Sequence, residues 1–189
     1  LTSYIGNLEQ DRFSAIKSST FYVTKSGIQD IPGTNRDRGY FVSLPALNQN
    51  INIISGSYNQ QFSKHEDKTL FLTALIPSEA ADLFELTPGD TIIATPTMKD
   101  SYESVVVQIS GIFERKPSGE NIWYLEETIL EASTGPTFAT IPFYIPQSTF
   151  LNDLGPAFEK LEGTYIWYVD INPDAISATK TTEIRGQLQ

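Results

Sequence analysis

The sequence contains no cysteine among its 189 residues, and only one histidine and one methionine. The absence of cysteine excludes disulfide bonds, thiolate catalysis and cysteine-based metal sites. It also suits an exported domain, in which wrong disulfide pairing is a hazard. The one histidine, His65, lies in a polar run, whereas catalytic and zinc sites ordinarily use several His or Cys residues at defined spacing. We therefore interpret His65 as a solvated loop residue and expect no metal site and no cofactor.

The sequence also lacks long hydrophobic runs and clusters of basic residues. No run approaches the ~18 apolar residues of a membrane span, and no signal peptide is present. The net charge is −10, from 13 basic and 23 acidic residues. Such a chain repels phosphate backbones, which argues against nucleic acid as a partner. Because neither Leu1 nor Gln189 resembles a natural terminus, we interpret the chain as an excised piece from which flanking membrane spans were cut away.

Motifs of common enzymes are absent from the sequence. It has no G-x-S-x-G elbow, no P-loop and no G-x-G-x-x-G, so the ATP-hydrolysing part of any transporter is not on this chain. Asp170, Asn172 and Asp174 place oxygens at alternate positions, but Pro173 and the missing glycine argue against a calcium loop. A helix start, with Asn172 as its cap and Pro173 in its first turn, explains these residues better.

Three carboxylates in the last third raise the question of catalysis. Glu126, Glu127 and Glu131 cluster beside aromatic residues, as the acids of a glycosidase do. Their spacing equally describes the solvated face of a short helix, which we favour because no second carboxylate pair frames a sugar.

Aromatic residues are abundant, at 12% of the chain, and they gather in the last third. On an expected strand over residues 164–171, Tyr165 and Trp167 face one side and Tyr168 the other. One aromatic face is expected to belong to the core, while the other can serve as a contact surface. The candidate contact residues are Trp123, Tyr124, Tyr165, Trp167 and Tyr168.

The pattern of apolar and turn residues predicts an α+β fold, since strands outnumber long helices. Expected helices begin at Pro77, at Pro146 and after Asn172, with weak helical periodicity over residues 7–19 and a polar loop over residues 59–68. The expected strands cover residues 20–24, 40–44, 51–54, 69–75, 91–95, 105–113, 137–144 and 164–171. Residues 70–113 are expected to form one compact unit with Leu75, Leu83, Phe84, Ile92 and Ile112 in its core.

The run from Ile76 to Ile92 combines a short helix rich in small residues with a Leu-Thr-Pro-Gly-Asp turn. A strand with a V-x-x-x-G-I-F pattern follows at Val107–Phe113, and Phe143–Pro146 joins an aromatic strand to a helix start. In this order, the motifs resemble the extracytoplasmic domain of MacB/FtsX-like ABC transporter permeases. The glycines and Asp90 in these motifs are fold signals, because they permit turns and bulges.

The resemblance implies a bilobed domain. A discontinuous porter-like lobe would comprise residues 1–53 and 117–189, and an inserted β-rich lobe would comprise residues 54–116. It also implies a non-catalytic domain outside the bacterial plasma membrane that couples cytoplasmic ATP hydrolysis to efflux, release or control of a partner protein. Its partners would be flanking transmembrane helices, a cytoplasmic ATPase subunit, and another permease copy or an extracytoplasmic protein or peptide. Leu1 and Gln189 would then lie on one side of the domain.

Two other hypotheses remain open at this point. The chain can be a free-standing extracellular module that binds a glycan or a peptide through its C-terminal aromatic residues. It can also be a hydrolase that uses Glu126, Glu127 or Glu131. Turnover of a glycan would favour the hydrolase, and a secretion signal with a stop after Gln189 would favour the module.

Overall fold

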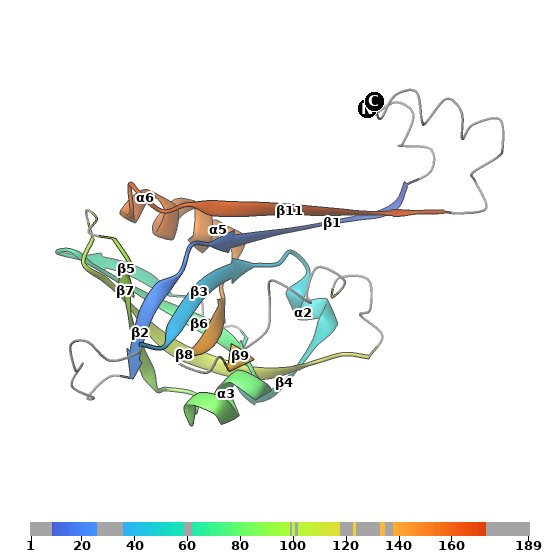
Figure 1. The fold of residues 1–189 in the computed structure, drawn as a ribbon. Helices are drawn as coiled ribbons and strands as arrows, with labels where there is room; N and C mark the ends of the chain where they lie inside the picture. The colour runs from blue at the N-terminus through green and yellow to red at the C-terminus, as the bar shows by residue number, and fades with distance from the viewer. Residues whose placement is uncertain are drawn as a thin grey trace. The chain divides into compact units, whose positions relative to one another are not determined.

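The computed structural model describes residues 9–25, 36–58, 62–98, 100, 102–117, 123, 133–134 and 138–172 (Figure 1). The chain divides into two compact units, of which the larger spans Ala15–Ile166. The smaller joins Leu1–Ser14 to Trp167–Gln189. Its described part consists of the first residues of strand β1 (Glu9–Ser18) and the last residues of strand β11 (Gly163–Ile171), followed by Asn172.

The predicted α+β class is confirmed. Eleven described strands join in one sheet, in the order β11-β1-β3-β2-β7-β8-β6-β10-β9, with β4 paired to β8 and β5 paired to β6. The other strands are β2 (Phe21–Lys25), β3 (Arg38–Ser43), β4 (Ile51–Gly56), β5 (Ser63–Glu66), β6 (Thr69–Pro77), β7 (Thr91–Pro96), β8 (Ser104–Arg115), β9 (Ser133–Thr134) and β10 (Ala139–Tyr144). The described helices are short: α2 (Leu47–Asn50), α3 (Ser78–Phe84), α5 (Gln147–Thr149), the π-helix η1 (Phe150–Leu154) and α6 (Gly155–Ala157).

Strand β8 is the centre of the sheet, because it pairs with β4, β6 and β7. Its β-branched residues alternate in burial: Val105, Val107 and Ile109 are buried, while Val106 is half-buried and Gln108 is exposed. Strands place successive side chains on opposite faces, so this alternation sends one row of side chains into the core. Two pairs in the sheet are parallel, β6 with β8 and β10 with β3.

The unit predicted over residues 70–113 is confirmed as strand β6, helix α3, and strands β7 and β8. Leu75, Ile92 and Ile112 are buried in it, and Phe84 packs partly buried against the core. The prediction for Leu83 is wrong, because its side chain is 38% exposed. Helix α3 buries Ala80 and Ala81, and residue 83 lies about 110° around the helix from the middle of that buried face.

Two predicted elements are wrong. Residues 7–19 showed weak helical periodicity, but their described part forms β1, which pairs antiparallel with β3 through Ile16 and Lys17. Pairing with a neighbouring strand outweighs a weak local preference. The predicted loop over residues 59–68 contains β5, which forms a hairpin with β6 through Asp67 at a φ of 51°. Its sequence is polar because three of its four residues are exposed.

The outcome of the remaining predictions differs from one to the next. The helix expected to begin at Pro146 is confirmed by α5, η1 and α6, which follow one another directly. The expected terminal helix and the positions of Leu1 and Gln189 lie outside the described residues. The sheet runs through both predicted lobes, since β2 pairs with β7. The lobe boundaries, residues 1–53 with 117–189 and residues 54–116, therefore stay a prediction.

The Leu-Thr-Pro-Gly-Asp motif forms a tight turn between α3 and β7. The amide of Asp90 donates to the carbonyl of Thr87 at 3.0 Å, and Gly89 between them has a φ of 98°. Proline followed by a glycine with positive φ is the pattern of a type II turn. One carboxylate oxygen of Asp90 accepts bonds from the amide and the hydroxyl of Thr87, at 2.8 and 3.0 Å. These bonds lower the pKa of Asp90, and Lys25, 3.8 Å away, lowers it further.

Two bulges bring β4, β6 and β8 together. The β6–β8 register shifts between Ala74 and Leu75, so that Ser110 is the extra residue on β8. The amide of Ser57 donates to the carbonyl of Ser110 at 2.9 Å, just after Gly56 at a φ of 76°. A Cβ on Gly56 would lie 2.3 Å from that carbonyl oxygen. The approach of the two strands therefore requires glycine.

We predict that Gly56→Ala destabilises the protein more than Gly89→Ala. Both residues have positive φ, which costs a residue with a Cβ about 1–2 kcal/mol. Only Gly56 has no room, since an added Cβ at Gly89 has nothing within 4 Å, so Gly56→Ala should cost about 1–3 kcal/mol more through overpacking. Urea unfolding followed by tryptophan fluorescence measures both. Equal losses would contradict this account of the bulge.

We predict a pH dependence for the Asp90 turn. A carboxyl with a lowered folded-state pKa stabilises the fold above its unfolded pKa, and this stabilisation is lost as the pH falls through the lower, folded-state value. Below about pH 4, the ordinary range of aspartate, wild type should therefore lose more of its free energy of unfolding than Asp90→Asn does. Urea titrations at a series of pH values measure this difference. Parallel curves for the two proteins would show that the carboxylate contributes nothing.

Candidate functional site

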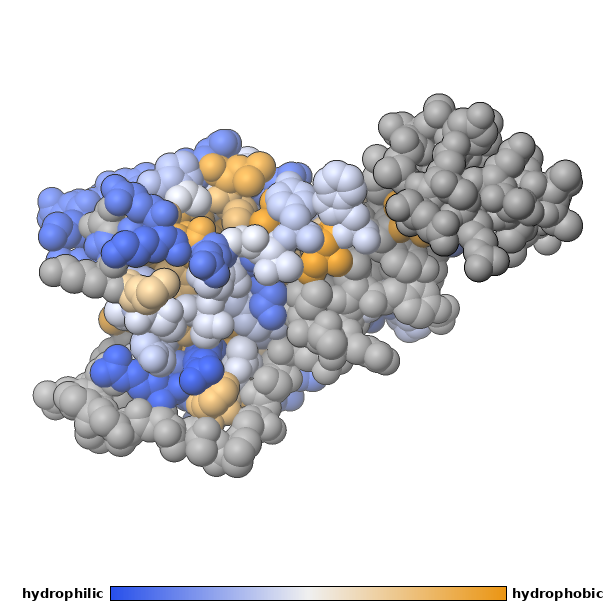
Figure 2. All heavy atoms as spheres, turned by 45° about the horizontal axis from the view of Figure 1, so that its top comes forward, coloured by the Kyte–Doolittle hydropathy of each residue, from blue (hydrophilic) through white to orange (hydrophobic). Residues whose placement is uncertain are grey.

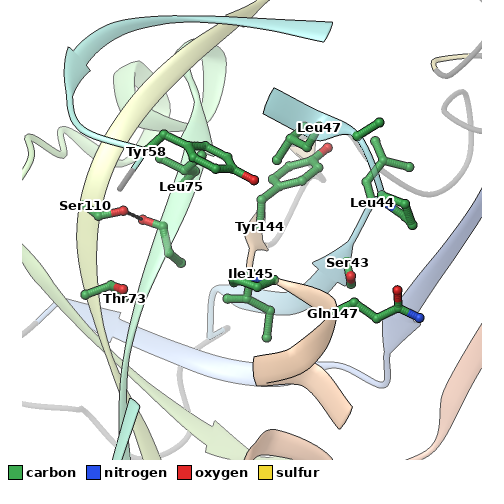
Figure 3. A pocket seen from close by; sticks show the side chains of 14 residues that line it. Ser43, Leu44, Leu47, Tyr58, Thr73, Leu75, Ser110, Tyr144, Ile145 and Gln147 are labelled. Atoms are coloured by element: carbon green, nitrogen blue, oxygen red, sulfur yellow. Dashed lines mark hydrogen bonds between the residues drawn. The ribbon is translucent and has the colours of Figure 1, made fainter. Parts of the chain in front are cut away.

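A cavity of about 170 Å³ opens in the larger unit, at the end of the β10–β3 pair (Figure 3). Its wall is formed by the ends of β3 and β10, the turns that follow them, and the middle of β6 and β8. Figure 3 shows Tyr58, Thr73 and Ser110 on one side, Ser43 on the other, and Tyr144 between them.

The turn after β3 forms one rim of the cavity. The amide of Leu47 donates to the carbonyl of Leu44 at 3.2 Å, with Pro45 and Ala46 between them. Ala46 has φ 60° and ψ 18°, a left-handed conformation that usually belongs to glycine and costs alanine about 1–2 kcal/mol. Strained backbone of this kind clusters at binding and active sites.

The floor comes from the parallel pair of β3 and β10. Their register joins Phe41 to Phe143 and Val42 to Tyr144, and the amide of Ile145 donates to the carbonyl of Val42 at 2.9 Å. Because both strands end here in the same direction, the chain leaves the sheet twice at one place. Pro146 then caps the start of the helix α5.

The wall opposite β3 carries hydroxyl groups. The bulge on β8 turns Ser110 so that its hydroxyl donates to the carbonyl of Ala74 at 3.0 Å. The hydroxyl of Thr73, one residue earlier on β6, accepts the amide of Phe62 at 3.0 Å. Bulges re-aim side chains in this way beside functional sites.

Ser43 lines the cavity on the side of β3 and is only 1% exposed. Its hydroxyl is not among the buried side-chain atoms that lack a hydrogen-bond partner. Ser43 adds a further hydroxyl to the lining of the cavity.

The described residues that line the cavity are uncharged. None of these side chains is acidic, basic or a histidine, although the whole chain carries a net charge of −10. Its apolar walls include Leu44, Leu47, Leu75 and Ile145. An unpaired charge is expensive to bury in such surroundings. The cavity can thus hold an uncharged group, and its lining offers hydroxyls and an amide.

His65 does not lie in a loop, as the sequence indicated, but on β5 in a chain of polar contacts. Its Nδ1 lies 3.0 Å from the hydroxyl of Tyr102, and its Nε2 lies 3.7 Å from a carboxylate oxygen of Asp153 on η1. Ser63 donates to the other oxygen of Asp153 at 2.8 Å. The side chains of His65 and Asp153 are 39% and 26% exposed, so these contacts lie at the surface and tie the β5–β6 hairpin to η1.

The predicted aromatic contact residues occupy different environments. Trp123 is buried, and the guanidinium of Arg115 lies over its ring at 5.2 Å. On β11, Tyr165 is 53% exposed and Trp167 is 68% exposed. Tyr168 belongs to the same strand, but its side chain and the whole of Tyr124 lie outside the described residues. A shared contact surface for these five residues stays a prediction.

The other candidates from the sequence lie mostly beyond the described ranges. This holds for Glu126, Glu127 and Glu131, and for Asp174 of the rejected calcium pattern. Among the residues that the structure describes, no group of three or more His, Asp or Glu side chains is placed to hold a metal ion. The absence of metals and cofactors stays an expectation.

Sequence reasoning did not find the cavity. Its lining is neutral and comes from segments far apart in the chain, so no spacing pattern marks it. Pro45 and Pro146, each placed directly after a strand, were the only signals in the sequence that two strands end there. The burial of Ser43 and the turn of Ser110 depend on strand pairing, which the sequence does not display.

Comparison with known proteins adds little to this picture. No protein family and no curated protein matches the sequence. The chain is similar in structure to a domain of a "putative Permease protein" from Porphyromonas gingivalis, with 16% identity and a TM-score of 0.42 over 96% of this chain and 69% of that chain. A likeness of this size establishes neither a family nor an activity. Within the described ranges, no helix has the length and apolar character needed to cross a membrane.

We predict that the polar chain around His65 contributes little to stability. Contacts between exposed charged groups are worth about 0.2–1 kcal/mol, so His65→Ala should cost less than about 1 kcal/mol in urea unfolding. Lys64→Ala, on the opposite face of β5 and in an exposed pair with Glu66, is the matched control. A loss above about 2 kcal/mol, or stoichiometric zinc found by metal analysis and lost in His65→Ala, would contradict this view.

Proposed function

We propose that the chain is a non-catalytic, extracytoplasmic domain of an ABC transporter permease of the MacB/FtsX-like class. The observation that carries the proposal is how the motif residues are used. Gly89 and Asp90 build the turn that leads into β7, and Gly111 follows the bulge on β8. These are the structural roles that the resemblance implies for them, in the same order along the chain.

The course of the chain supports attachment at both ends. β1 and β11 are neighbours in the sheet, and the amide of Ser19, after β1, donates to the carbonyl of Glu162, before β11, at 2.7 Å. The two strands therefore run in opposite directions, as Figure 1 shows, and the start of β1 lies beside the end of β11. Glu9 and Asn172 both belong to the smaller unit. Two flanking membrane spans would leave the domain from one place.

The chemistry of the cavity supports binding over catalysis. A hydroxyl nucleophile needs a base within hydrogen-bond reach, and the described residues that line the cavity include no histidine, carboxylate or amine. In the proposed permease, ATP hydrolysis takes place on a cytoplasmic subunit and the domain acts by binding and by moving. A second permease copy, or an extracytoplasmic protein or peptide, would be its partner, and the net charge of −10 disfavours nucleic acid.

One observation favours a second candidate. Tyr165 and Trp167 on β11 expose large aromatic surfaces, and aromatic side chains of this kind bind sugars and peptides. A free-standing extracellular glycan- or peptide-binding module would present them to solvent in the same way. The two candidates differ in whether the chain is tied to a membrane.

We predict that the domain is reached from outside the plasma membrane in cells that express the full-length gene. Since this chain has no cysteine, a single introduced cysteine reports on its position. Lys68→Cys replaces a side chain that is 68% exposed, and Ala94→Cys, at a fully buried site on β7, is the matched control. A membrane-impermeant maleimide should label Lys68→Cys on spheroplasts and should label Ala94→Cys only after denaturation.

The parent protein without substitutions gives the background from cysteines elsewhere in its sequence. The labelled protein should stay in the membrane fraction after the cells are broken. Labelling of Lys68→Cys only after the plasma membrane is opened would overturn the extracytoplasmic placement. Labelled protein in the soluble extracellular fraction would favour the free-standing module.

A further inference from the structure

Four described strands of the sheet pair with a single neighbour. The strands β2, β3, β6, β7, β8 and β10 close into a ring, because β3 pairs with β10 as well as with β2. A closed ring of strands has no edge at which another strand can be added. The strands β4, β5, β9 and β11 are attached to this ring or to β1, and each of them pairs with one other described strand.

Three of these four strands carry a feature that protects an edge. β9 has only two residues, and β4 is interrupted by a bulge between Ile53 and Ser55. β5 has four residues, of which Lys64, His65 and Glu66 are exposed. Short strands, bulges and exposed charged side chains are the means by which proteins prevent the addition of a further strand.

β11 is neither short nor rich in charge. It is nine residues long, seven of these residues are β-branched or aromatic, and it contains no proline, lysine or arginine. Its single charged residue, Asp170, is the last but one. Thr164, Tyr165 and Trp167 are exposed. An accessible strand of this length and composition is a template for pairing with another chain.

The area of this edge argues against a second copy of the chain as the occupant. Nine residues in a strand span about 30 Å, and an edge with side chains on both faces is about 10 Å deep. The edge of β11 thus offers on the order of 300 Å², whereas each partner of a stable dimer buries about 800 Å². Two copies that each carry a net charge of −10 would also repel one another. A single extended segment needs no more than the edge itself.

The charge and the exposed rings indicate a basic segment. Residues 159–172 carry three acidic side chains and one basic side chain, within a chain of net charge −10. Tyr165 and Trp167 lie on one face of β11, and each is more than half exposed. Aromatic faces attract cations, and arginine most often. The chain itself contains such a contact, since the guanidinium of Arg38 on β3 lies 3.8 Å from the ring centroid of Phe138, just before β10.

We propose that β11 binds an extended, basic segment of another protein, which joins the sheet as a further strand. Backbone hydrogen bonds to β11 hold the segment, and its arginine or lysine side chains lie over Tyr165 and Trp167. This inference rests on the binding role proposed above and identifies the chemistry of the partner. It is tested on the purified chain, whereas the labelling experiment tests location, so that either can fail without the other.

The test is the binding of synthetic peptides to the purified 189-residue chain, followed by NMR. The basic probe is a peptide of the length of β11, blocked at both ends, in which arginine alternates with valine and threonine. In the acidic control, glutamate replaces arginine. We expect the basic peptide to bind at least about tenfold more tightly than the acidic one and to shift the backbone amides of β11.

Methylation of the peptide backbone separates strand addition from attraction between side chains. In two further basic peptides, one or the other set of alternate amide nitrogens is methylated, which removes hydrogen-bond donors and keeps every side chain. At least one of the two should bind about tenfold more weakly than the parent peptide, because its hydrogen bonds to β11 are lost. Equal affinities of all three basic peptides would overturn the proposal.

Two variants of the chain locate the binding surface. Trp167→Ala removes a ring from β11, and Thr164→Lys gives this strand the kind of charge that protects β5. Each should weaken the binding of the basic peptide about two- to fivefold, the first through loss of a cation–π contact and the second through repulsion. Phe62→Ala removes an aromatic ring that is 53% exposed outside β11, and it should leave the affinity unchanged. Thermal unfolding verifies that each variant folds.

Several other results would contradict the proposal. They are no binding of the basic peptide at about 1 mM, the weak end of the range of specific affinities, amide shifts centred away from β11, and an equal loss of affinity in Phe62→Ala and Trp167→Ala. Binding of a neutral oligosaccharide to β11 in place of the peptides would show a glycan surface. A dimer of the free chain in analytical ultracentrifugation that is lost in Thr164→Lys would assign the edge to a second copy.

Discussion

The rest of the structure depends on one constraint, the parallel pairing of β6 with β8. Across this pairing β8 has one residue more than β6, which forms a bulge. The pairing places the buried valines of β8 in the core, and it leaves the other edge of β8 to β7 in its first half and to β4 in its second half. The extra residue is Ser110, and its bulge requires glycine at the two places where β4 and β8 approach most closely, Gly56 and Gly111. Figure 2 shows that apolar surface on one face of the molecule occurs in small areas among polar ones. Most apolar side chains of β6 and β8 are buried.

The same bulge shapes the cavity. It turns Ser110 so that its hydroxyl donates a hydrogen bond to the carbonyl of Ala74. On the other side of the cavity, at the ends of β3 and β10, Ser43 is buried. Among the described residues that line the cavity, none carries a charge. The turn at Ala46 on the rim has a strained, left-handed backbone, and such strain often occurs beside binding sites.

The sequence predicted the fold where local signals agree with the pairing of strands. Pro77, Pro88 and Gly89 mark the boundaries of α3 and β7, and the valines of β8 alternate as a half-buried strand should. The predictions from the sequence were wrong where the local signals were weak or absent. The first residues of the described chain form β1 because β3 pairs with them, and polar β5 is a strand because it pairs with β6. Leu83 is exposed because it does not lie on the face of α3 that buries Ala80 and Ala81. The sequence could not predict the cavity, because strand register decides which hydroxyls are buried. Register does not show in a single sequence.

The central claim is that this chain lies outside the plasma membrane and is held to it. Fusion of alkaline phosphatase after Gln189, in a full-length gene truncated at that point, tests this claim most directly, because the reporter is active only outside the cytoplasm. The account predicts phosphatase activity in the membrane fraction of the cells. A stable fusion without activity, or activity in the soluble fraction, would contradict it.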